Sequence, residues 1–279
     1  MKKALLFTVI SSLTLGIHAG DWGKAPIAPK SPIEECYDLG GSISSGYMTD
    51  FVFQGSRHAR DTVWGDVKYT FDAFSVPVTL GATYYNFTGG AAFENGVFDD
   101  FLHTYASFNL GSPAGFDTTF AFNQVFFPEG TGPVVTATSQ TVLTLNTRRD
   151  IAGFVDLLVG TSYSAGGGGS VPFDFSGGWY HSAGLEKSFG LTDNVSLVLG
   201  TGVGYSDHYW VHFWNTGWAN YYVNASVPIQ LNCRTTLTPY IGYNGGMGDN
   251  ILGFKSSDSL DSAGGGDVLS GGVSISVAF

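Results

Sequence analysis

A strict alternation of apolar and polar residues is the feature of this sequence that most restricts its fold. It is clearest over residues 219–231. The odd positions there are Ala219, Tyr221, Val223, Ala225, Val227, Ile229 and Leu231, and the even positions include Asn220, Tyr222, Asn224, Ser226 and Gln230. Side chains of a strand point to opposite faces in turn, so this period of two indicates a strand with one apolar and one wet face. Because a soluble barrel is apolar inside, the pattern predicts a barrel of the opposite kind, with an apolar outer face and a polar lumen.

Segments with this alternation recur along the chain. Each is about ten residues long, which is the length that a tilted strand needs to cross a bilayer. We predict 12 of them, at 42–53, 62–72, 76–86, 101–110, 117–127, 135–147, 153–163, 178–188, 195–206, 218–231, 235–244 and 268–279. The connectors at 73–75, 111–116, 148–152, 189–194 and 232–234 are short, and those between them are longer. Short turns at one end and long loops at the other are typical of outer-membrane barrels. The sequence thus predicts an all-β fold, a transmembrane antiparallel up-and-down β-barrel of about 12 strands.

The composition agrees with a membrane barrel. Charged residues make up 13% of the chain, aromatic residues make up 15%, and there are 40 glycines. A secreted β-sandwich, the main alternative, would need more charge on its outer faces. The net charge of −11 argues against binding to nucleic acid by charge.

The first residues have the order of a secretory signal peptide. Lys2 and Lys3 precede an apolar stretch, and Ala19 offers a small residue for cleavage. Prolines in the segment that follows disfavour a central strand there. We therefore expect a signal peptide at 1–19, a periplasmic N-terminal tail at 20–40 and the transmembrane β-barrel at 41–279. Export through the secretory pathway to the bacterial outer membrane follows from this reading.

The last segment alternates up to its final residue. Val273, Ile275, Val277 and Phe279 share one face, and small residues lie between them. We expect Phe279 to belong to an aromatic girdle on the periplasmic side and to serve as an assembly signal. The expected partners are accordingly outer-membrane lipid and the barrel-assembly machinery, which reads such a terminal strand.

Charged residues at inward positions suggest what the barrel could pass. By alternation Asp50, Asp66, Asp156 and Glu186 point inward with a single base, Lys68. An excess of acids in a narrow pore favours cations. The alternative for Asp66 and Lys68 is that they pair with neighbours and brace the wall.

Neutral hydrogen-bonding residues are the second feature of the predicted lumen. They are His103, Tyr105, Asn220, Tyr222, Asn224 and Tyr240. They could bind uncharged polar solutes in a narrow part of the pore. The alternative is that they line the lumen and contact only water. Because a barrel of this size is narrower than a general porin, we expect passive diffusion of small hydrophilic solutes through a selective pore, without a cofactor. A structural or adhesive barrel without transport is the alternative.

Residues that could support an enzyme are few and poorly spaced. His181 and Ser182 are adjacent and so face opposite ways, which argues against a lipase dyad. Acids at 99 and 100, together with Asp207, His208 and His212 on another loop, superficially resemble the acid and Asp/His pairs of outer-membrane proteases. A metal site at the latter three would need a helical loop. We expect no enzymatic activity and no metal site.

The two cysteines provide one further expectation. Cys36 lies in the predicted tail and Cys233 in a short turn, both on the oxidising periplasmic side. We predict a disulfide between them, and two free thiols or a bond to another subunit are the alternatives.

The first two predicted strands also resemble the opening of the TorF-type porins. That family begins with a strand of the form Ser/Thr-Asp-Tyr/Phe-x-Phe/Tyr-Arg-Gly. Thr49, Asp50, Phe51, Phe53 and Gly55 match this form, whereas Gln54 stands where arginine is usual. The resemblance covers about 30 residues and implies an outer-membrane channel-like protein without naming a solute.

Overall fold

The computed structural model describes residues 39–53, 56–73, 75–89, 100–126, 139–168, 176–209, 216–247 and 267–279. The predicted signal peptide and nearly all of the predicted tail lie outside these residues. None of the described residues forms a helix that is long and apolar enough to cross a membrane.

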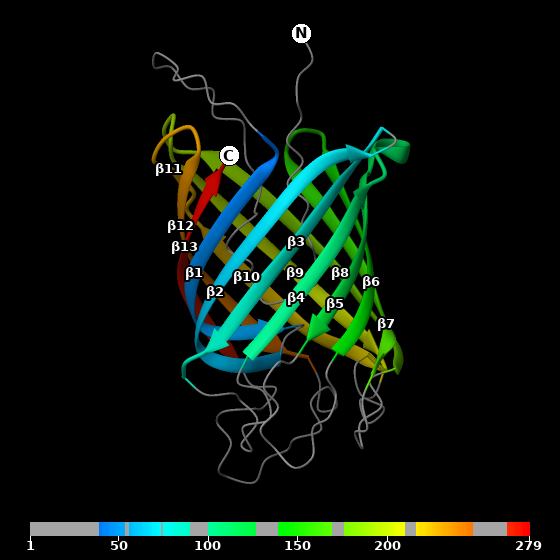
Figure 1. The fold of residues 1–279 in the computed structure, drawn as a ribbon. Coiled ribbons are helices and arrows are strands. Elements are labelled where there is room, and N and C mark those ends of the chain that lie inside the picture. Colours follow the sequence, from blue (N-terminus) through cyan, green and yellow to red (C-terminus); the bar gives the residue numbers. More distant parts are fainter. Residues whose placement is uncertain are drawn as a thin grey trace.

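Antiparallel strands make up almost all of the described chain (Figure 1). The first half contains β1 (Gly41–Phe53), β2 (Ser56–Ala73), β3 (Val76–Phe87), β4 (Asp100–Asn109), β5 (Asp117–Phe126) and β6 (Ser139–Ile151), with one short 3-10 helix, η1 (Pro113–Gly115). The second half contains β7 (Val155–Gly168), β8 (Ser176–Gly190), β9 (Ser196–Asp207), β10 (Gly217–Ser226), β11 (Ile229–Gln230), β12 (Thr235–Gly246) and β13 (Val268–Ala278).

The sheet closes on itself, because consecutive crossings pair with each other and β1 pairs with β13. β10 and β11 are two parts of one crossing, since both pair with β12. The ladder is interrupted at Pro228, which has no N–H to donate, and its carbonyl oxygen accepts a hydrogen bond from Ser196 N at 3.1 Å. The fold is therefore a closed barrel of 12 crossings, and the predicted fold class is confirmed.

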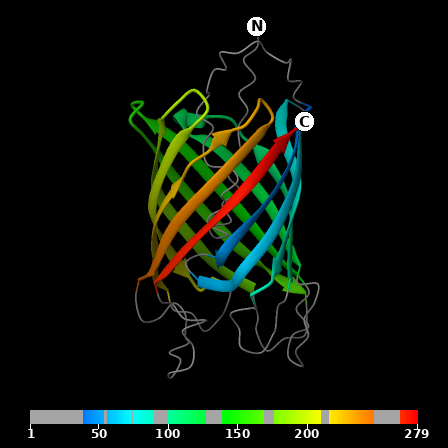
Figure 2. The same ribbon diagram turned by 90° about the vertical axis from the view of Figure 1, so that its left-hand side faces the viewer.

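The short connectors all lie at one end of the barrel, together with the C-terminus (Figures 1 and 2). One of them differs from the prediction. The sixth strand was expected at 135–147, but β6 continues to Ile151 and pairs with β7 across a turn at 152–154. Ala152 and Gly153 adopt positive φ values of 56° and 72°, which makes this turn tight enough for the strands to extend to its edge. Arg148, expected in the connector, thus belongs to a strand.

Large apolar side chains cover the outer face of the barrel. Every second residue of a strand is exposed there, for example Ile43, Val63, Val67, Leu80, Phe122, Leu145, Val159, Leu185, Leu199, Val223, Ile241, Val273, Ile275 and Val277. A continuous apolar outer face needs lipid around it.

Ala219 departs from the predicted alternation. Ala219 was expected on the outer face but is 4% exposed, whereas its neighbour Trp218 is 55% exposed. The cause is a bulge between Trp218 and Asn220, which shifts the register of β10 against β9.

Candidate functional site

The inner face of the barrel is lined by buried polar residues from all 12 crossings. Representatives in strand order are Ser44, Thr62, Thr83, His103, Asn123, Gln140, Ser162, Glu186, Ser206, Asn224, Asn244 and Ser274. They alternate with the exposed apolar residues of the outer face. The barrel therefore has a polar interior inside an apolar wall, the arrangement found in membrane barrels.

The 11 residues predicted to face the lumen occupy positions of this inner set. They are Asp50 on β1, Asp66 and Lys68 on β2, His103 and Tyr105 on β4, Asp156 on β7, Glu186 on β8, Asn220, Tyr222 and Asn224 on β10, and Tyr240 on β12. Their positions have the same parity as the buried polar residues of their strands. A role of these side chains in solute passage remains a prediction.

Three of the interior charges form one cluster near the end with the short turns. Arg148 Nη2 on β6 lies 2.5 Å from Asp156 Oδ2 and 2.9 Å from Glu186 Oε1. Asp156 and Glu186 are also direct cross-strand partners. The guanidinium offsets the repulsion between the two carboxylates and stabilises the charge of Glu186, which is 1% exposed.

Arg148 was missing from the predicted set of inward charges. The alternation of the sixth segment was expected to end at residue 147, although Arg148 continues its even-numbered inner positions. Extending that parity by one residue would have found it. Since Arg148 neutralises part of the charge of Asp156 and Glu186, the acids exceed the bases in the lumen by less than the sequence suggested.

Asp66 has partners on the two strands that follow it. Its Oδ1 accepts hydrogen bonds from Thr83 Oγ1 at 2.7 Å and from Tyr105 Oη at 3.4 Å. These bonds link β2, β3 and β4 on the inner side. Asp66 thus braces the wall, and its charge also faces the interior.

A ladder of hydrogen-bonded neutral polar groups crosses the four strands β4, β5, β6 and β7. His103 Nε2 lies 3.1 Å from Asn123 Oδ1, and Asn123 Nδ2 donates to Thr144 Oγ1 at 3.2 Å. Thr144 Oγ1 in turn lies 3.4 Å from Ser162 Oγ. Of these four residues only His103 is among those predicted to face the lumen. Asn123, Thr144 and Ser162 have no distinctive motif, so only their inward parity could have indicated them.

Interior tyrosines lie along the wall because glycines on neighbouring strands leave room for them. A Cβ atom on Gly81 would lie 2.3 Å from Cζ of Tyr105, and one on Gly202 would lie 2.6 Å from Cζ of Tyr222. Only glycine allows so close an approach. The rings therefore extend sideways over the next strand, and less of their bulk points to the barrel axis.

One hydrogen bond between inner side chains reaches from β8 across β9 to β10. Tyr180 Oη donates to Asn220 Oδ1 at 2.9 Å. The amide of Asn224 packs over Gly200, and Tyr240 packs over Gly272. These contacts fix side chains that were predicted as lining.

The residues weighed for an enzyme are dispersed. His181 is exposed on the outer face and is hydrogen-bonded to Thr161, whereas Ser182 has the opposite parity. His208 Nδ1 lies 2.7 Å from Asp207 Oδ1 at an exposed strand end. The residues at 99 and 212 lie outside the described part. Within the described residues, no group of three or more His, Cys, Asp or Glu is placed to hold a metal ion.

The predicted periplasmic rim contains the remaining site residues. Phe279 N donates to Gly41 O at 2.9 Å, and the Phe279 ring lies against Gly41. Cys233, in the turn at 231–234, is disulfide-bonded. Cys36 lies outside the described residues, so its pairing with Cys233 stays a prediction.

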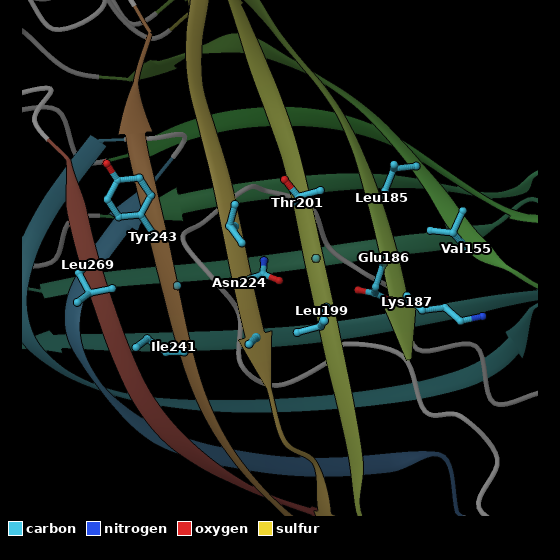
Figure 3. Close-up of a pocket in the computed structure, with 14 residues that line it drawn as sticks. Val155, Leu185, Glu186, Lys187, Leu199, Thr201, Asn224, Ile241, Tyr243 and Leu269 are labelled. Atoms are coloured by element: carbon cyan, nitrogen blue, oxygen red, sulfur yellow. The ribbon is translucent and has the colours of Figure 1, made fainter. Parts of the chain in front are cut away.

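A shallow apolar hollow lies on the outer face of the barrel (Figure 3). It is bordered by Leu185 and Leu199, by Ile241 and Leu269, and by Lys187 near one end. Because these apolar residues belong to the lipid-facing set, the hollow is part of the membrane-exposed surface.

Comparison with known proteins shows the fold. No family model and no curated sequence matches the chain. Among solved structures, an outer membrane channel from Pseudomonas putida F1 is similar with a TM-score of 0.52 at 10% identity, over 89% of this chain and 99% of that chain. The KdgM porin and the NanC porin each give a TM-score of 0.47, at 8% and 10% identity, over 85% and 86% of this chain and 99% and 100% of theirs. The chain thus has the fold of a bacterial outer-membrane β-barrel, and its apolar outer face matches a lipid bilayer.

Proposed function

We propose that this barrel is a porin-like channel of the bacterial outer membrane through which small hydrophilic solutes diffuse passively. The observation that carries the proposal is the polar inner face, to which every crossing contributes buried hydrogen-bonding residues. Porins likewise present a polar inner face to the hydrophilic solutes that cross them. The resemblance of residues 45–71 to the TorF-type porins supports the same function.

The proposed channel has a weak preference for cations. Asp50, Asp66, Asp156 and Glu186 face inward, and Lys68 and Arg148 offset part of their charge. A modest excess of acids attracts cations without excluding neutral solutes. Solute entry is thus governed by size first and by charge second.

Liposome swelling tests the proposal. Vesicles containing the protein without residues 1–19 are diluted into isotonic solutions of neutral sugars of increasing size. The proposal predicts fast swelling with a monosaccharide and slow swelling with a trisaccharide. Swelling no faster than in protein-free vesicles for every sugar, with the barrel folded, would favour the structural or adhesive alternative.

A further inference from the structure

We propose that Phe51, on the described part of β1 before the hairpin end, forms the constriction of the channel at the mouth opposite the short turns. This proposal rests on the proposed function, because only a channel has a constriction. Phe51 has the odd parity of Ile43 and Tyr47, which are 54% and 38% exposed on the outer face. Phe51 itself is 2% exposed.

The ring contacts of Phe51 show that it has left the outer face. Its centroid lies 4.9 Å from that of Tyr85, 5.5 Å from that of Phe87 and 5.8 Å from that of Phe101. Tyr85 belongs to the inner face of β3, since it is fully buried while its neighbour Tyr84 is 42% exposed. β2 separates β1 from β3 in the sheet. Phe51 therefore reaches these rings from the interior side.

Irregularities of β2 lie beside this turn of the hairpin, where β2 has one residue more than β1 after the Phe51–Ala59 pair. The register of β1 against β2 shifts between Phe51 and Val52, and Asp61 on β2 has a positive φ of 47°. Bulges bend a strand and change which face a side chain occupies. At the bend, residues on both faces of the hairpin are buried. Val52 is 2% exposed, and Ala59, the partner of Phe51, is fully buried. In Figure 1 the ends of β1 and β2 turn across the lower end of the barrel.

The base of the hairpin is held on both sides. Gly271 N on β13 donates to Thr49 Oγ1 at 3.0 Å. After β3, Thr88 N donates to Asp61 O at 3.0 Å and Gly89 N donates to Arg60 O at 3.1 Å. These bonds fix the base of the hairpin on both sides of Phe51, which suits a permanent narrowing.

The rings around Phe51 continue into a larger apolar cluster at this level of the barrel. Its members are Met48, Phe51, Ala59, Trp64, Tyr85, Phe101, Val125, Val142, Tyr180, Tyr209, Ala219 and Tyr240. They come from strands on nearly opposite sides of the barrel, for example β3 and β10. Most of them lie within a few residues of the strand ends opposite the short turns. An apolar ring of this kind narrows a pore and disfavours wide hydrated solutes.

Substitution of Phe51 tests the constriction, with Phe122 as the matched control. Phe122 is an outer-face residue of β5 and is 44% exposed, so Phe122→Ala removes the same side chain without touching the interior. In planar bilayers we expect Phe51→Ala to raise the single-channel conductance by roughly twofold or more, because the narrowest part of a pore sets its resistance. Phe122→Ala is expected to match the unchanged protein. Phe101→Ala, on the other side of the same contact, serves if Phe51→Ala does not fold.

The outcomes separate the two proposals. Higher conductance and a larger sugar size limit for folded Phe51→Ala or Phe101→Ala support the constriction. Conductance equal to that of the unchanged protein in both folded variants overturns the constriction and leaves the channel intact. Absence of conductance in the unchanged protein and in both variants overturns the channel, and the constriction with it.

Discussion

Arg148 shows how a single residue alters both the stability and the electrostatics of this barrel. It is the base between Asp156 and Glu186, and Glu186 is almost completely buried. Removing one member of a buried ion cluster leaves the others without compensation. The two effects on stability and ion preference can be measured separately.

We predict that Arg148→Gln destabilises the barrel and increases its cation preference. Loss of the guanidinium leaves two neighbouring carboxylates unpaired, which should cost on the order of 2 kcal/mol, discounted for the partial exposure of Asp156. Denaturant unfolding and the reversal potential in a salt gradient measure the two effects. Arg149→Gln is the control, since Arg149 is exposed and its guanidinium lies over the Phe116 ring. An unchanged reversal potential for folded Arg148→Gln would mean that the cluster does not face the ion path.

We also predict that deletion of Phe279 reduces assembly much more than it changes conduction. Phe279 pairs with Gly41 at the seam that closes the barrel, and its carbonyl oxygen accepts hydrogen bonds from Leu39 N and Gly41 N. The assembled fraction in outer-membrane preparations is the measurement. Phe71→Ala, which removes another exposed aromatic residue, is the control. Normal insertion of the truncated protein would show that this residue is not the assembly signal.

At the scale of elements, the sequence predicted where most strands lie but not where they bend. Period-two alternation located all 12 crossings, because each strand must present one face to lipid. Alternation carries only parity, so a single extra residue reverses the inferred face. This is why Ala219, the extra residue of β10 beside Trp218, was assigned to the wrong face. For Phe51 the register with β2 is unbroken, so its position inside the barrel depends on the bend of the hairpin, which alternation does not record.

The candidate site was predictable to a similar degree. Inward parity selected the charged residues of β2, β7 and β8, but Arg148 depended on the exact end of β6. Strand ends depend on the turn that joins them, and the tight turn at 152–154 has only a glycine as its sequence signal. The polar ladder through Asn123 consists of ordinary polar residues, which become a network only when the strands are in register.

The disulfide between Cys36 and Cys233 is a prediction about the tail as an element. The bond would close a loop of about 200 residues, and the lost chain entropy of the unfolded state would stabilise the fold by at most about 5 kcal/mol. It would hold the tail near the rim at the end with the short turns. Thiol labelling of the denatured, unreduced protein is the measurement, with Cys233→Ser as the control. Two labelled cysteines per chain would exclude the bond, and unchanged conductance after reduction would exclude a role of the tail in narrowing the pore.

At the scale of the whole molecule, closure of the sheet should give the barrel strong resistance to unfolding. β1 and β13 pair over seven positions, from Ser42 with Ala278 to Met48 with Gly272, so no long sheet edge is left at the seam. We predict that the protein in detergent has a circular-dichroism spectrum dominated by β-strand and changes its gel mobility on heating. A spectrum dominated by helix, or the same mobility with and without heating, would contradict a closed barrel.

The central claim is that the polar interior conducts solutes across the membrane, and single-channel recording in planar bilayers tests it most directly. The purified protein without residues 1–19, shown to be folded by its heat-dependent mobility, is added to one side of a bilayer. We predict discrete current steps that are proportional to voltage. In a salt gradient, we predict a reversal potential whose sign shows a modest preference for cations. Bilayers that contain the folded protein and show no steps above the protein-free background would contradict the claim.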